Sequence, residues 1–183
     1  MYKKFEEILA RQCAPVLLGK KPAALFPEPS WWETDFFDAA VLPHIQCMPL
    51  SMTGKNNLVF VYRSELLESV LNKGEVRGAL ANLDYPAAGS VTDYLRYLSL
   101  RFLMSQEFPH EVGFFLGYPP ADVLGFIRHK GTCCKLCGLW KVYSDVEKAR
   151  ALFKEYERCK QLLLEYIQKG GGLSAVPPET IAG

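Results

Sequence analysis

The chain has 183 residues and a formal net charge of +1, and 49% of its residues are hydrophobic, including 11 Phe, 9 Tyr and 3 Trp. This length fits one domain of about 100–200 residues, and the composition is typical of a globular protein and not of a disordered one. The positive and negative charges are balanced, and the sequence has no basic stripe of the kind that binding to a phosphate backbone requires. Nucleic acid is therefore not an expected partner.

Nothing in the sequence indicates secretion or membrane insertion. The first residues, MYKKFEEILARQ, lack the apolar core of a signal peptide, and no stretch approaches the roughly 18–20 apolar residues of a membrane span. The protein is therefore expected to be cytoplasmic, without a membrane partner. In that compartment its six cysteines are expected to be reduced thiols and not a disulfide framework.

The first expected element is a short amphipathic helix over residues 2–12. Phe5, Ile8 and Leu9 recur at helical spacing, which places them on one face. Residues 13–43 contain five prolines and are expected to form a long irregular segment that wraps around the domain.

The adjacent side chains Trp31 and Trp32 lie in this wrapping segment. Exposing two indole rings without a partner is costly, so they are expected either to pack against the core or to stack on a ligand. Packing is the simpler explanation, and both residues stay candidate contacts.

A hairpin and two helices are expected next. Residues 44–50 and 57–63 are strand-like and flank the turn sequence TGKNN. Ser64 then begins a helix that runs to about Lys73, with carboxylates in its first turn. A further amphipathic helix is expected to start near Ser90.

Residues 112–116 are apolar at both sets of alternate positions, which predicts a central strand covered on both faces. Residues 117–120, Gly-Tyr-Pro-Pro, then turn the chain into a helix over 120–129, and residues 135–143 form another strand. Strand, helix and strand over this length predict a parallel βαβ unit.

The last helix is expected to begin at Ser144, which forms a capping box with Glu147, and to end at the glycines 170–172. Residues 1–172 are expected to form a single globular domain, followed by a flexible tail over 173–183. The predicted fold is α/β or α+β, with a mixed sheet of about four strands flanked by helices and the long irregular N-terminal wrap.

A thiol-rich segment raises the question of metal binding. His129, Cys133, Cys134 and Cys137 are close in sequence, but zinc sites usually present a second pair of ligands on another turn. Cys137 also falls in an expected strand, where residues three apart face opposite sides. No metal site is therefore expected. A reactive Cys-x-x-Cys pair is disfavoured too, because this one precedes a strand and not a helix.

Cys13 and His110 are the candidate catalytic pair. If Pro15 begins a new helix, Cys13 caps it and the helix dipole makes the thiol more acidic; if Cys13 closes the first helix, the dipole opposes the thiolate. His110 could act as the base, because a Cys–His pair needs only proximity in space. The alternatives are a buried, unreactive Cys13 and a capping or edge His110.

The turn at Gly117 and Tyr118 is the candidate binding site. In sheets flanked by helices, ligands favour the carboxyl ends of strands, and the expected strand 112–116 ends here. Pro119 and Pro120 offer no N–H groups to an anion. The site therefore favours a neutral or cationic ligand, or a protein partner.

Four segments of the chain resemble the uncharacterised domain-of-unknown-function family 3793, which is found in anaerobic Gram-positive bacteria. They are FPHEVGFFLGYPPADVLGFIRHKG, KLCGLWKVYSD, LVFVYRSELL and CAPVLLGKKPAAL, within residues 1–165. The positions that the resemblance marks are Cys13, Pro15, Lys21, His110, Glu111, Gly117, Tyr118, Pro119, Cys137, Gly138 and Trp140. Cys133 and Cys134 fall outside the pattern. The family has no assigned activity, so the resemblance implies no mechanism.

The leading functional hypothesis is a non-catalytic module that binds a small molecule or a protein. Its candidate contacts are Tyr118, Trp31, Trp32, Glu111 and Trp140. The alternative is a thiol-dependent enzyme or redox protein that uses Cys13 and His110, with Cys137 as a further candidate thiol. The sequence identifies no cofactor and no particular ligand.

Overall fold

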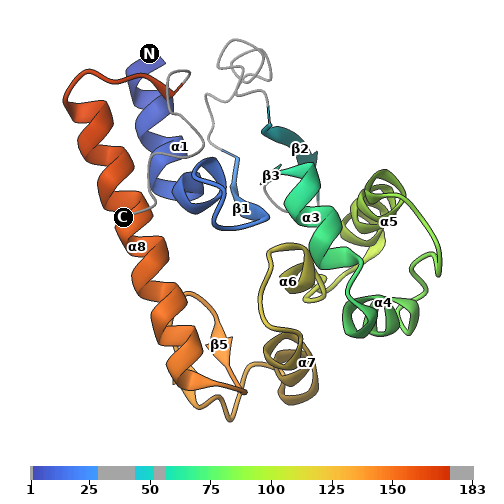
Figure 1. Cartoon of the computed structure of the whole chain (residues 1–183). Helices are drawn as coiled ribbons and strands as arrows, with labels where there is room; N and C mark the ends of the chain where they lie inside the picture. The colour runs from blue at the N-terminus through green and yellow to red at the C-terminus, as the bar shows by residue number, and fades with distance from the viewer. Residues whose placement is uncertain (1, 29–43, 52–56, 174–183) are drawn as a thin grey trace.

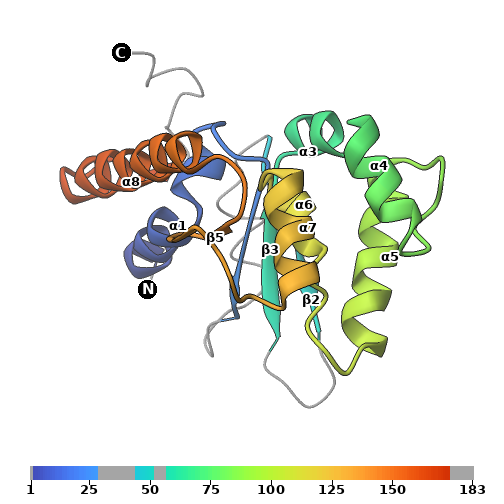
Figure 2. The same ribbon diagram turned by 90° about the horizontal axis from the view of Figure 1, so that it is seen from below.

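The computed structural model describes residues 2–28, 44–51 and 57–173, with side chains from residue 5 onward. A three-stranded antiparallel sheet lies between two layers of helices, as the views in Figures 1 and 2 show. Helices from the two ends of the chain cover one face, and helices from its middle cover the other. The sheet therefore has two apolar faces to bury.

The strand order in this sheet is β1 (Ala23–Pro27), β3 (Leu58–Tyr62) and β2 (Gln46–Leu50). Both pairings are antiparallel, and Phe60 lies between Leu25 and Met48 in the register. The hairpin expected from the TGKNN sequence is confirmed as β2–β3, although residues 52–56 lie outside the described part of the chain.

The central strand β3 divides the hydrophobic interior into two cores. Val59 and Val61 face the core that includes Phe26, whereas Phe60 faces the core that includes Leu50. All three β3 side chains are buried, as the alternation of a strand between two layers requires. A strand buried on both faces is the prediction for residues 112–116, but this role belongs to β3.

The first layer is formed by α1 (Tyr2–Leu17) and α8 (Val146–Gln168), which lie side by side (Figure 1). α1 extends past the predicted end at residue 12, so the irregular segment begins later than expected and is soon interrupted by β1. Trp31 and Trp32 belong to residues 29–43, which lie outside the described ranges.

The last helix, α8, begins close to the predicted position, but its N-cap is one residue later than predicted. α8 is capped by Asp145, whose carboxylate accepts a hydrogen bond from the Lys148 N–H at 3.0 Å, and not by Ser144. Beyond α8, Leu173 is buried and donates its N–H to Glu6 Oε1 at 2.8 Å. The first residue of the predicted tail is thus held against α1, and residues 174–183 are not described.

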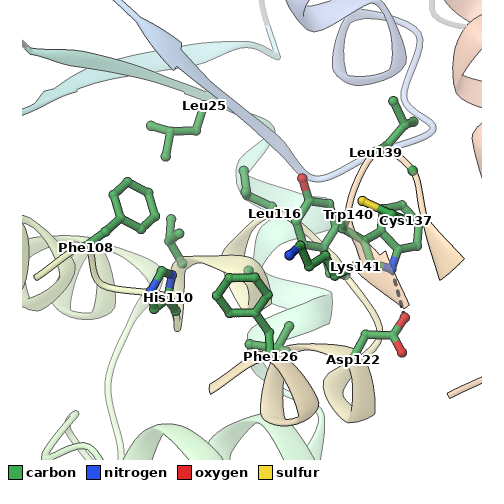
Figure 3. A pocket seen from close by; sticks show the side chains of 15 residues that line it. Leu25, Phe108, His110, Leu116, Asp122, Phe126, Cys137, Leu139, Trp140 and Lys141 are labelled. Atoms are coloured by element: carbon green, nitrogen blue, oxygen red, sulfur yellow. Dashed lines mark hydrogen bonds between the residues drawn. The ribbon is translucent and has the colours of Figure 1, made fainter. Parts of the chain in front are cut away.

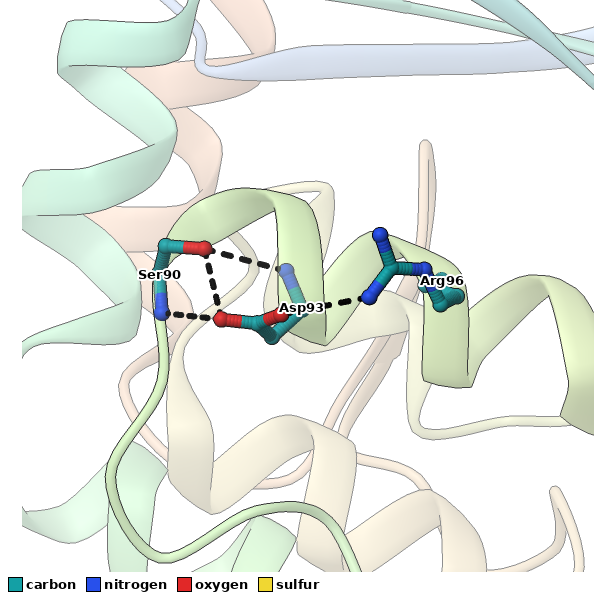
Figure 4. Close-up of polar contacts among 3 residues, drawn as sticks. All are labelled: Ser90, Asp93 and Arg96. Atoms are coloured by element: carbon teal, nitrogen blue, oxygen red, sulfur yellow. Dashed lines mark hydrogen bonds and ion pairs between the residues drawn. The ribbon is translucent and has the colours of Figure 1, made fainter.

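The second layer begins with α3 (Ser64–Leu71), α4 (Gly74–Ala81) and α5 (Val91–Met104). α5 has the predicted start, because Ser90 Oγ accepts from the Asp93 N–H at 3.3 Å and Asp93 Oδ2 accepts from the Ser90 N–H at 2.9 Å (Figure 4). This reciprocal capping box satisfies two N–H groups of the first turn that would otherwise lack partners.

The predicted strand over residues 112–116 is wrong. Val112–Phe115 form a single helical turn, α6, which is followed by α7 (Pro120–His129) as expected. The Val112 N–H donates to Pro109 O and the Leu116 N–H to Val112 O, at 3.1 and 3.0 Å. A segment that is buried on every side shows no periodicity, so its apolar run fits a helical turn as well as a strand.

The strand predicted over 135–143 is also wrong in its extent. It is a short antiparallel ribbon of β4 (Leu136–Cys137) and β5 (Lys141–Val142), joined by a turn at residues 138–140. The ribbon is separate from the main sheet, so the predicted parallel βαβ unit does not form. The turn directs Trp140 into the protein, where its indole finds a buried acceptor.

The fold is therefore a mixture of helices and sheet, as predicted, and the two sheets are both antiparallel. It corresponds to the α+β alternative, in which helices and strands do not alternate in parallel units. Among the helices that the structure describes, none combines the length and apolar character needed to cross a bilayer.

Candidate functional site

A cavity of about 450 Å³ opens between α6, α7, the β4–β5 ribbon and the edge of β1 (Figure 3). Its wall is largely apolar, and its hydrophobic and aromatic lining residues are Leu25, Phe108, Val112, Leu116, Tyr118, Val123, Phe126, Leu139 and Trp140. The volume lies within the range of about 300–1,000 Å³ that is usual for small-molecule sites. His110, Cys137 and Lys141 add polar groups to the same wall.

The two candidate contacts Tyr118 and Trp140 form one wall of this cavity together. Their rings are stacked with centroids 4.8 Å apart and planes 24° apart. Phe153 of α8 supports Trp140 from another side with its ring edge-on, at 4.5 Å and 81°. Because both rings are held by neighbours, the wall is rigid before any ligand arrives.

Asp122 of α7 fixes the ribbon that carries Trp140. Its Oδ2 accepts the indole N–H of Trp140 at 2.8 Å, as the dashed line in Figure 3 shows. Its Oδ1 accepts the backbone N–H groups of Tyr143 and Ser144 at 2.8 and 2.7 Å, and the Ser144 hydroxyl at 2.7 Å. One buried carboxylate thus joins α7 to the ribbon and to the segment that leads into α8.

The charge of Asp122 is stabilised by these donors. Burial alone would raise the pKa of its carboxyl, but the hydrogen bonds from Ser144, Trp140 and Tyr143 outweigh burial and hold the pKa below its ordinary value. The carboxylate is therefore ionised and fully engaged, so it holds the ribbon in place and has little capacity left for a ligand.

Two glycines allow the backbone to approach closely at this site. Gly117 has φ +76°, and a Cβ there would lie 2.6 Å from Pro22. A Cβ on Gly113 would lie 2.9 Å from the Val123 side chain. The left-handed turn at Gly117 brings Tyr118 back onto α6, whose Gly113 O accepts the Tyr118 N–H at 3.0 Å.

His110 lies at the opposite side of the cavity from Trp140 (Figure 3). It is exposed, and its ring contacts Phe126 and Phe108 with centroids 4.7 and 5.5 Å apart. Lys141 donates one amine N–H to Gly131 O at 2.5 Å, which leaves two further N–H groups on that ammonium. The cavity therefore pairs aromatic walls with two groups that can donate hydrogen bonds.

Cys13 is not brought together with His110. Cys13 lies inside α1, where the helix continues through Pro15, so it caps no new helix. It is fully buried in the core between α1 and α8, and burial raises the pKa of its thiol, with Lys21 opposing that effect. His110 belongs to the other helical layer, beside α7. The arrangement gives no support to a Cys13–His110 mechanism.

Glu111 points away from the cavity that its neighbour His110 lines. Its carboxylate is buried and accepts a hydrogen bond from Arg101 Nε at 2.8 Å, and the Tyr85 hydroxyl lies 3.5 Å away. This ion pair joins the start of α6 to α5. It gives Glu111 a structural partner and no route to a ligand in the cavity.

The thiol-rich segment does not converge on a point. Within the described ranges, no group of three or more His, Cys, Asp or Glu side chains has an arrangement that could hold a metal ion. Cys133 has φ +57° and is exposed, whereas Cys137 lies on the ribbon and lines the cavity. Cys137 is thus the one thiol of this segment that shares the cavity with His110.

Sequence reasoning missed Asp122, Phe108, Phe126 and Lys141 as residues of the site. A carboxylate three residues into a proline-opened helix is usually a local cap, and no local pattern indicates that Asp122 accepts from residues about twenty positions later. Phe108 and Phe126 could have been suspected only from their flanking of the 110–120 segment.

The family model for proteins of unknown function DUF3793 matches residues 9–176, so the chain belongs to this family. This confirms the resemblance drawn from the four sequence segments. A search of curated proteins found no match, and a search of solved structures found none. The function must therefore be argued from the site itself.

Proposed function

We propose that the protein is a non-catalytic module that binds a small, planar, largely apolar molecule in the cavity between α7 and the β4–β5 ribbon. The observation that supports this most is the stacked pair Tyr118–Trp140, which faces an aromatic and aliphatic wall across about 450 Å³. Flat π surfaces bind best in offset or edge-on contact with aromatic rings, and Tyr118, Phe126 and Trp140 supply such rings to the lining.

The charges around the cavity favour a neutral ligand with a hydrogen-bond acceptor. Asp122 is the carboxylate on the wall, and both its oxygens are occupied by donors of the protein. Lys141 keeps two N–H groups beyond its bond to Gly131 O. A carbonyl or ring nitrogen on the ligand would accept from Lys141 or His110, while its apolar body replaces water between the rings.

Thiol chemistry is the weaker candidate. The buried position of Cys13 and its raised pKa disfavour the thiolate, which is the reactive form. Cys137 is exposed on the cavity wall, but no hydrogen bond links it to His110 among the described contacts. The binding function needs neither thiol.

Nile red, a neutral planar dye, tests the proposal. We expect saturable binding, seen as a rise in dye fluorescence, and about tenfold weaker binding by the variant Leu139→Trp, which corresponds to about 1.4 kcal/mol. Leu139 is 55% exposed and lines the cavity, so an indole there would fill its entrance without disturbing the core.

The matched control is Leu100→Trp on α5. Leu100 is 47% exposed and is not among the residues that line the cavity, so this variant should bind like the wild type. Equal weakening by both variants, or dye binding that never saturates, would count against the cavity as a binding site. Mass spectrometry of molecules that co-purify with the native protein then identifies the physiological ligand class.

A further inference from the structure

A second cavity, of about 260 Å³, lies on the other side of Tyr118, between α1 and α8. It shares Tyr118 and Leu139 with the first cavity and is otherwise built from different residues. Pro15 and Tyr156 contribute apolar surface, and Lys21 projects its amine against this wall. The chemistry of this second cavity does not depend on the apolar ligand proposed for the first.

Among the residues that the structure describes, the amine of Lys21 has aromatic neighbours and no ion-pair partner. Its Nζ lies 5.0 Å from the Tyr118 ring centroid and 5.8 Å from that of Tyr156. None of the ion pairs or side-chain hydrogen bonds found among the described residues includes this amine. The adjacent Lys20, in contrast, is exposed and lies 4.0 Å from Glu155.

This environment favours the neutral amine. Burial lowers the pKa of Lys21 to about 8, and only the Cys13 thiol opposes that change. At about pH 7.5 the fraction of free amine is then on the order of a hundred times that of an ordinary lysine with a pKa near 10.4. Desolvation in an apolar pocket is the usual way in which a lysine becomes a nucleophile.

We propose that Lys21 captures a small aldehyde that carries an acidic group, and holds it as a reversible imine. The amine lone pair of Lys21 attacks the carbonyl carbon, and the carbonyl oxygen takes up a proton to give a carbinolamine. Loss of water from this adduct, with departure of the second amine proton, forms the C=N bond. The step needs no oxidant or reductant.

Tyr118 and Tyr156, whose rings lie beside the Lys21 amine, carry the hydroxyls that would assist this proton transfer. Burial raises the pKa of both Tyr118 and Tyr156, the latter to about 12, so both hydroxyls stay protonated at neutral pH. A protonated hydroxyl can donate to the carbinolamine oxygen as water leaves. The rings of the same residues keep the amine away from bulk water, which would otherwise hydrolyse the imine.

The rim of the cavity favours an acidic group on the aldehyde. Arg11 lines the rim and makes no ion pair with another described residue. Lys160 and Glu157 also line it and pair with each other at 3.4 Å, so their charges cancel. Arg11 therefore supplies an unbalanced positive charge that a phosphate or carboxylate would complete.

Pyridoxal 5′-phosphate is a suitable probe, because it is an aromatic aldehyde with a phosphate. The protein is treated with a low concentration of it at about pH 7.5, the imine is reduced with borohydride, and the labelled peptides are mapped by mass spectrometry. We expect Lys21 to be labelled at least about tenfold faster than Lys20, with a rate that rises as pH passes through about 8.

Variants and a second probe separate the outcomes. Lys21→Arg keeps the charge and should lose the label, whereas Lys20→Arg should keep it. 5′-Deoxypyridoxal, which lacks the phosphate and keeps a free aldehyde, should label Lys21 several-fold more slowly if Arg11 binds the acidic group. Labelling of Lys21 at the rate of Lys20 in the wild-type protein would overturn the site, and equal labelling by both probes would overturn the role of Arg11. Neither result bears on Nile red binding.

Discussion

Tyr118 separates two regions that surround a charged side chain in opposite ways. On one side, Asp122 accepts four hydrogen bonds, from Trp140, Tyr143 and twice from Ser144. On the other side, Lys21 lies beside two rings and forms no ion pair among the described residues. A satisfied buried charge holds one arrangement of the chain in place, whereas an unsatisfied one raises the free energy of the folded state and stays available to a ligand.

The two regions therefore have different roles. Asp122 has a structural role. Its carboxylate joins α7 to the ribbon and to the segment that leads into α8, and it keeps Trp140 stacked on Tyr118. The Lys21 side is suited to a reaction, because burial lowers the pKa of its amine and no ion pair among the described residues offsets that effect. Substitutions at the two positions should therefore change stability in opposite directions.

The largest effect is expected for Asp122→Ala. This change leaves the Trp140 indole N–H and two backbone N–H groups without acceptors, which should lower the free energy of unfolding by about 4 kcal/mol. Urea denaturation followed by fluorescence measures it. Nile red binding should weaken as well, because the ribbon that carries Trp140 is no longer held.

Asp122→Asn is the matched control and also gives the pH dependence. The amide keeps one acceptor oxygen, so the loss should be about half as large. Since the folded pKa of Asp122 lies below its ordinary value, its ionised form stabilises the protein fully above about pH 4 and loses that effect as pH falls through the folded pKa. The gap between wild type and Asp122→Asn should therefore narrow on acidification, and a gap that stays constant would contradict the role of the charge.

Sequence patterns predicted the parts of the fold that local interactions determine. The β2–β3 hairpin follows from two strand-like runs around a Gly/Asn turn, and α5 begins at Ser90 as expected. Each of these features depends on residues within a few positions of one another. Such signals are contained in any short window of the sequence.

The parts that failed depend on contacts between distant residues. The run at 112–116 is buried on every side, so only its neighbours decide between a strand and the turn of α6. Residues 135–143 form a ribbon in which the Trp140 indole donates to Asp122. No alternation of apolar and polar residues in the sequence indicates this contact. Only the family resemblance marks Lys21 as a position of interest. No local pattern indicates its contacts, because Tyr118 and Tyr156 are far away in sequence.

The candidate site was predicted in part for the same reason. His110, Tyr118 and Trp140 line one cavity, but their role as ligand contacts stays a prediction. Glu111 is a candidate contact that the family resemblance marks, but the helical turn directs it to Arg101 and away from the cavity that His110 lines. Adjacent residues of a helix point about 100° apart, so a chain neighbour is a poor guide to a neighbour in space.

A smaller effect of opposite sign is expected for Lys21→Met. The methionine fills the same apolar space without a charge, so the free energy of unfolding at about pH 7 should rise by about 1.5 kcal/mol. This value is smaller than the full pKa shift would give, because Lys21 is only partly buried and solvent screens its charge. Lost cation–π contact with the two tyrosines works against this gain.

The pH dependence of this gain distinguishes charge from packing. The folded pKa of Lys21 is lower than the unfolded one, so the wild type carries the full penalty below about pH 8 and loses it as pH rises toward about 10.4. The advantage of Lys21→Met should disappear over that range. An advantage that is independent of pH would show that packing and not charge sets it. Lys20→Met at the exposed neighbouring position should be close to neutral.

The smallest effect is expected for Ser90→Ala, which removes a local contact far from Tyr118 in the chain. The capping box of α5 is exposed, and its loss should lower the free energy of unfolding by about 1 kcal/mol. Ser90→Thr keeps the acceptor for the Asp93 N–H and the hydroxyl donor to Asp93 Oδ2, so it should recover most of this loss. Both changes should leave Nile red binding and Lys21 labelling unaltered, because α5 contributes no residue to either cavity. If Ser90→Ala lowers the free energy of unfolding as much as Asp122→Ala does, local capping and buried long-range hydrogen bonds contribute equally to stability. That result would contradict the structural role given to Asp122.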